Sequence, residues 1–104
     1  MTTLQYLRVW PEWESTGIWA LDQPLQRTAG KCVGYDQLPI SQELVARFTA
    51  WQDEFSDWAP ENDRPDGFWD RHYQEMQDLA QALKHELGPH QHVEYCIGYT
   101  PTVV

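Results

Sequence analysis

The sequence predicts an α/β fold of the α+β type, in which a helical hairpin packs on one face of a small sheet. Two stretches place large apolar residues at helical spacing, and three shorter stretches have the apolar pattern of strands. The elements follow one another in the order β-β-α-α-β. Because each helix has one apolar stripe to cover, the simplest arrangement is a two-layer sandwich of helices on a sheet.

The first predicted helix begins after Ser41 and ends near Trp58. Its apolar residues are four, three, four and three positions apart, which places them on one helical face: Leu44, Phe48, Trp51, Phe55 and Trp58. Ser41 is the expected N-cap, because its hydroxyl can accept a backbone N–H of the first turn. Pro60 cannot continue the helix. We expect Trp51 to be buried between this helix and the sheet.

The second predicted helix covers residues 67–87, with Asp66 as its expected N-cap. Its apolar stripe has the same spacing and comprises Trp69, Tyr73, Met76, Ala80, Leu83 and Leu87. His72 and His85 lie off this stripe, so we expect both to be solvated. Gly88 is the expected helix-ending residue, because glycine tolerates a positive φ.

Three strands are predicted, at residues 3–10, 17–21 and 93–99. The first has apolar residues on both faces, as central strands do. We therefore expect the second strand to form a hairpin with it and the last strand to pair on its other side. Pro101 is expected to close the last strand.

The chain has 104 residues, which predicts a single domain covering residues 1–104. Apolar residues make up 41% and aromatic residues 13%, enough for a core without a metal or a disulfide. The first residues have no basic region and no long apolar run, so we expect no secretion signal. No apolar run approaches the ~20 residues of a membrane span. We expect a cytoplasmic protein with reduced thiols, in which Cys32 and Cys96 are small buried residues.

Residues 22–38 form an irregular segment in which residues 31–33 are at most a short strand. No serine motif, phosphate-binding loop or H-E-x-x-H motif occurs, so no catalytic residue and no cofactor are predicted. His90 and His92 could supply two metal ligands, but no third ligand has a recognisable spacing. Carboxylate pairs such as Asp53 and Asp57 leave a small enzyme as a third, weaker hypothesis.

The net charge is −9, which argues against nucleic acid or an anionic membrane as a direct partner. It favours solubility or a basic protein partner. Acidic residues gather at the end of the first helix, in the linker and at the start of the second helix. The candidate partner-binding residues are Asp53, Glu54, Asp57, Glu61, Asp63, Asp66 and Asp70.

Two features of this acidic group disfavour stability. Asp53 and Asp57 are like charges four residues apart on a helix, and acidic groups near a helix C-terminus oppose its dipole. A solvated face that keeps the protein soluble remains the simpler explanation. The tryptophan-rich hairpin between Trp10 and Trp19 and the irregular segment 22–38 are the alternative binding surfaces.

Several stretches together resemble small acidic bacterial proteins, among them immunity proteins of contact-dependent and polymorphic toxin systems: Leu7–Trp13, Gly17–Trp19, Leu38–Leu44, Phe48–Trp51, Leu79–Gly88 and Val93–Tyr95. The resemblance implies an inhibitor that binds one cognate toxin domain in the cytoplasm. Together with the charge, it leads to the hypothesis of an immunity protein against a basic toxin, such as a nuclease. The alternative is a small acidic binding or structural module without a toxin partner.

Overall fold

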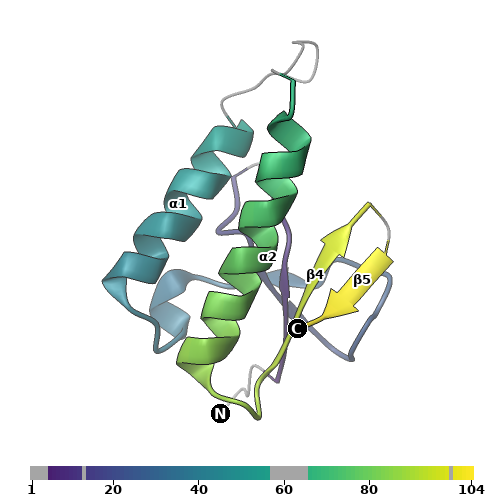
Figure 1. Ribbon diagram of the computed structural model, residues 1–104. Helices are drawn as coiled ribbons and strands as arrows, with labels where there is room; N and C mark the ends of the chain where they lie inside the picture. Colours follow the sequence, from purple (N-terminus) through teal and green to yellow (C-terminus); the bar gives the residue numbers. More distant parts are fainter. Residues whose placement is uncertain (1–4, 13, 57–65, 99) are drawn as a thin grey trace.

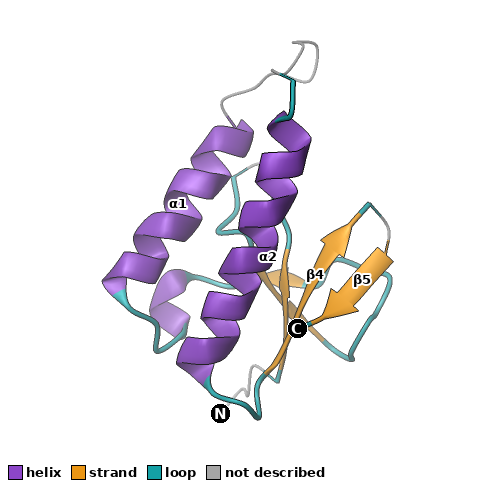
Figure 2. Cartoon of the chain, viewed as in Figure 1, coloured by secondary structure: helices purple, strands orange, loops and turns teal. Residues whose placement is uncertain are grey.

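The computed structural model describes residues 5–12, 14–56, 66–98 and 100–104. Its elements are, in order, β1 (Tyr6–Val9), β2 (Ile18–Leu21), β3 (Lys31–Cys32), the 3-10 helix η1 (Tyr35–Gln37), α1 (Gln42–Ser56), α2 (Phe68–Leu87), β4 (His92–Ile97) and β5 (Thr100–Val103). The two helices lie side by side and α2 packs over β1 and β4 (Figure 1). Figure 2 shows the helices and the strands as separate layers, which confirms the α+β class.

The sheet has the strand order β3-β2-β1-β4-β5. Strand β1 lies at its centre, antiparallel to β2 and parallel to β4, so both predicted pairings of the first strand are confirmed. In the register of β1 and β4, Leu7 is opposite Val93 and Arg8 is opposite Glu94. Side chains alternate between the two sheet faces, so Leu7 and Val93 face the helices while Arg8 and Glu94 share the other face.

The core lies between the helices and the sheet. Trp51 is 2% exposed, as expected, and its indole Nε1 donates a hydrogen bond of 3.2 Å to the carbonyl oxygen of His72 on α2. Buried residues from both layers pack around it, among them Leu7, Val9, Ile18, Phe48, Met76, Leu83 and Val93.

The first helix begins as predicted. The Ser41 hydroxyl accepts the Leu44 N–H at 3.1 Å. The Glu86 carboxylate accepts both the Ser41 N–H, at 2.6 Å, and the Ser41 hydroxyl, at 2.8 Å. This contact ties the start of α1 to the end of α2. At that end Gly88 has a φ of 104° and its N–H donates to the Lys84 carbonyl, which confirms the expected glycine stop.

The start of α2 differs from the prediction. Gly67, not Asp66, is the N-cap residue, and it has a left-handed φ of 79° without a side-chain cap. The Gly67 carbonyl accepts the Arg71 N–H, which is the first backbone hydrogen bond of the helix. Glycine reaches this conformation at little cost, whereas Asp66 one residue earlier lies outside the cap position.

The C-terminal part of the sheet also differs from the prediction. Pro101 does not close the last strand: β4 ends at Ile97, and Pro101 lies within a further strand, β5, opposite Cys96. Strand β5 is at the sheet edge, where a proline can leave its missing N–H on the open side. Cys96 is buried as expected, but Cys32 is exposed, because β3 is the short strand at the opposite edge. Trp58, Pro60 and Tyr99 lie outside the described residues.

Candidate functional site

Four of the seven candidate acidic residues can be placed. Asp53 and Glu54 are exposed near the end of α1, and Asp66 and Asp70 are exposed at the start of α2. These two helix ends meet at the same end of the hairpin, at the top of Figure 1. Asp57, Glu61 and Asp63 lie outside the described residues.

The acidic residues suit the helix dipole of α2 but oppose that of α1. Asp70 lies in the first turn of α2, and Lys84 and His85 lie in its last turn, an arrangement that suits the helix dipole. His85 is exposed, as expected. Helix α1 has no basic residue in its last turn. The carboxylates of Asp53 and Glu54 therefore oppose its dipole, and nothing in the described part of α1 offsets them.

An exposed aromatic side chain, Trp69, lies close in sequence to Asp66 and Asp70. Trp69 is 41% exposed and stacks on Tyr73 with ring centroids 5.5 Å apart. Its assignment to the buried stripe was wrong, whereas Tyr73, one turn later, does pack against the core. Helical spacing identifies the side of the helix on which a residue lies, but it does not tell how far the covering layer extends. Tryptophan beside tyrosine is typical of interface centres.

His72 is 2% exposed, so the expectation that it is solvated was wrong. Its imidazole stacks on the ring of Phe68, with centroids 5.4 Å apart, and on the ring of Trp51, at 4.9 Å. The residue packs as an aromatic ring where the two helices meet. This cluster anchors the acidic helix ends to each other.

The opposite face of the sheet carries a buried ion pair that the sequence reasoning missed. The Arg8 Nε and Nη2 atoms donate to Glu94 Oε2 at 3.0 and 2.8 Å, and the two residues are 5% and 0% exposed. Glu94 Oε1 also accepts the Leu25 N–H at 2.9 Å and lies 2.8 Å from His92 Nε2. The one feature of the sequence that could have indicated this ion pair was Arg8, a charged residue in the middle of a strand that is apolar on both faces.

These contacts set the protonation of Glu94. Burial alone would raise the pKa of its carboxyl group, but hydrogen bonds from His92, the Leu25 N–H and Arg8 outweigh that effect. The pKa of Glu94 is therefore lowered from its ordinary value. The carboxylate stays ionised and holds the loop containing Leu25 against the sheet.

Among the described residues, no group of three or more histidine, cysteine or acidic side chains could hold a metal ion. His92 contacts Glu94, and His90 is exposed in the turn that precedes β4. Within the same residues, no helix is both long and apolar enough to cross a membrane.

No curated protein matches this sequence. The family model described as Serratia CdiI immunity protein-like matches residues 5–97, which include both helices, β1 to β4 and the acidic helix ends. The expected resemblance to contact-dependent inhibition immunity proteins is thereby confirmed, and the chain belongs to the Serratia CdiI immunity protein-like family.

Proposed function

We propose that this protein binds and inhibits a cognate toxin domain in the cytoplasm, and that it does so through an acidic surface at the end of the helical hairpin where α1 leads into α2. This acidic surface comprises Asp53, Glu54, Asp57, Glu61, Asp63, Asp66 and Asp70. Membership of an immunity protein family supports the inhibitory role. The position of the binding surface rests on charge and exposure.

The observation that best supports this surface is the pair of carboxylates at the C-terminal end of α1, whose last turn contains no basic residue. Asp53 and Glu54 lie where carboxylates weaken a helix by about 0.3–1 kcal/mol each. Residues that work against stability are often retained for function. Trp69 supplies a large ring beside these charges, since Asp66 and Asp70 flank it in sequence and it is itself exposed.

The partner that fits this surface is a basic protein domain. Lys and Arg side chains would pair with the carboxylates and could stack on Trp69. A nuclease toxin has such a basic surface, because it must bind phosphates. An acidic inhibitor that occupies the same groups blocks the substrate without any chemistry of its own.

The experiment measures toxin binding and growth protection with a neutralised variant. The variant replaces four described carboxylates by their amides: Asp53→Asn, Glu54→Gln, Asp66→Asn and Asp70→Asn. The control makes the same change in net charge at exposed sites elsewhere: Glu14→Gln, Asp22→Asn, Asp36→Asn and Glu43→Gln. We expect the first variant to lose affinity for the toxin domain and to protect poorly, while the control retains both.

Undiminished affinity of the first variant, with folding intact, would reject the acidic surface. A loss of affinity in the control alone would redirect attention to the Trp10–Trp19 hairpin or residues 22–38, which contain three of its four sites. A protein that binds no toxin domain encoded beside its own gene, and whose native-host partner is a different protein, would support the alternative of an acidic binding module without a toxin partner.

A further inference from the structure

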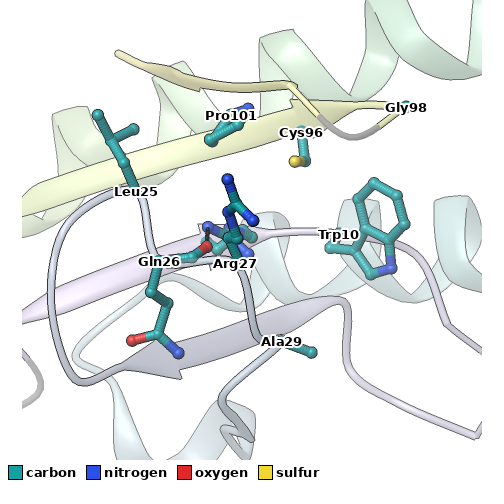
Figure 3. Close-up of a pocket in the computed structure, with 9 residues that line it drawn as sticks. Trp10, Leu25, Gln26, Arg27, Ala29, Cys96, Gly98 and Pro101 are labelled. Atoms are coloured by element: carbon teal, nitrogen blue, oxygen red, sulfur yellow. Dashed lines mark hydrogen bonds between the residues drawn. The ribbon is translucent and has the colours of Figure 1, made fainter.

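The sheet face opposite the helices contains a pocket that is unrelated to the acidic surface. Its volume is about 540 Å³, within the range of small-molecule sites. Its walls come from β1, from the loop between β2 and β3, and from the β4–β5 hairpin (Figure 3). The loop is held against the sheet by the contacts of Arg8 and Glu94.

The pocket contains basic side chains in a strongly acidic protein, and because Glu94 already neutralises Arg8, Arg27 supplies its net positive charge. Arg8 and Arg27 line it, and no Asp or Glu is among the described residues that line it. Arg27 is an exposed residue of the loop, and Figure 3 shows it beside Cys96 and Gln26 around the same space. Two of the seven basic residues of the chain therefore meet at one concave site.

Arg8 retains hydrogen-bonding capacity in this pocket. Its Nε and Nη2 atoms bind Glu94, Nη2 also donates to the Gln26 carbonyl, and Nη1 donates to the Thr28 carbonyl at 3.3 Å. A guanidinium carries five N–H groups. Within the described residues, these bonds leave one Nη1 N–H without an acceptor, on a residue that is 5% exposed.

The remaining walls are largely apolar. Trp10 presents an indole ring at one side, and Leu25 and Pro101 line the pocket from the loop and from β5. Such walls favour a ligand with a flat or branched apolar body, because inorganic anions would leave them unfilled. The arginines would pair with its charged end.

We propose that this pocket binds a small organic carboxylate with an aromatic or branched apolar body. The carboxylate accepts hydrogen bonds from Arg27 and from the remaining Nη1 N–H of Arg8, and the apolar body packs on Trp10 and Leu25. The inference does not rest on toxin binding, because the pocket and the acidic surface are on different elements.

The test is an NMR titration of the ¹⁵N-labelled protein with phenylacetate, and in parallel with the neutral isostere phenylacetamide. We expect phenylacetate to give saturable shifts at Trp10, Arg27, Ala29 and Gly98, and to bind about tenfold tighter than the amide, which corresponds to one charge-assisted interaction. Inorganic phosphate should not saturate the same shifts.

Two variants check the assignment. Arg27→Gln should weaken phenylacetate binding about tenfold. Lys31→Gln removes an exposed charge from neighbouring β3 without touching the pocket, so it should leave binding unchanged. Both sites are exposed, so folding should persist, and thermal melts verify this. Equal binding of the acid and the amide, shifts that do not saturate, or an Arg27→Gln variant with unchanged affinity would overturn the proposal.

Discussion

At the scale of single residues, the contact between Arg8 and Glu94 is the most consequential polar interaction. Replacing Glu94 by Gln removes the charge and leaves the Arg8 guanidinium buried beside a neutral amide. We expect the free energy of unfolding to fall by about 3–5 kcal/mol, as measured by urea denaturation.

The matched control is Glu75→Gln. Glu75 pairs with Arg47 at 3.4 Å between the helices, and both side chains are 41% exposed. Solvent screens such a pair, so the change should cost at most about 1 kcal/mol. Similar losses in the two variants would show that burial does not distinguish the two ion pairs.

Glu94 should also make the stability of the protein depend on pH. The pKa of Glu94 is lower in the folded protein than its ordinary value of 4.5. Its contribution to stability is therefore complete above that value and is lost as the pH falls toward the folded pKa, because the unfolded chain binds the proton first. Denaturation curves from about pH 6 to about pH 3 should show a steeper loss for the wild type than for Glu94→Gln. Parallel curves would contradict this.

Sequence reasoning was successful at this scale only for local chemistry. The Ser41 cap and the Gly88 stop follow from near neighbours in the chain, and both were correct. The partners Arg8 and Glu94 are 86 positions apart, and their contact requires the register of β1 and β4. The strand patterns indicated that pairing but not its register.

At the scale of elements, the packing of α1 on the sheet depends on Trp51. Truncating this buried ring to alanine leaves a large cavity, so Trp51→Ala should cost about 3–5 kcal/mol of unfolding free energy. A melting temperature equal to that of the wild type would place Trp51 outside the core and would contradict the two-layer arrangement.

Replacing Gly17 tests how closely the turn before β2 approaches the indole ring of Trp51. A Cβ at Gly17 would lie 2.8 Å from a ring carbon of Trp51, and the residue has a φ of 83°. Gly98 has a φ of 63° but open space around it. Both alanine variants incur the left-handed strain of about 1–2 kcal/mol, so Gly17→Ala should be the more destabilising of the two in thermal melts. Equal losses would exclude the steric contact.

The errors at this scale have a common cause. Trp69 and His72 were assigned from the angular position of each residue on α2, and both assignments were wrong. Exposure also depends on where the neighbouring elements end. Near the N-terminus of α2, Phe68 and Trp51 cover His72, whereas Trp69 stays exposed. Strand β5 was missed because Pro101 normally ends a strand, and only its edge position permits it.

At the scale of the whole molecule, fold class and family were predictable because many weak signals agreed across the chain. The pocket beside Arg8 could not be predicted from the sequence, because its walls come from three separate segments of the chain. The acidic surface was proposed from charge alone, and the described residues place Asp53, Glu54, Asp66 and Asp70 at one end of the hairpin.

An exposed aromatic ring in that position predicts a binding hot spot. Trp69→Ala should weaken toxin binding by about 2 kcal/mol or more, mainly through faster dissociation. Because this ring also packs on Tyr73, a thermal melt verifies that the variant is folded at the temperature of the binding measurement. Ile97→Ala removes another exposed apolar side chain, at the end of β4, and serves as the control. Unchanged dissociation for Trp69→Ala would remove this ring from the interface.

The most direct measurement of the central claim is the association rate of the protein with its toxin domain as a function of salt. If the acidic surface docks a basic partner, the wild-type rate should fall steeply as salt rises. The variant with Asp53, Glu54, Asp66 and Asp70 neutralised should associate slowly and show a much weaker salt dependence. A wild type and a neutralised variant with the same association rates at low and at high salt would contradict the claim.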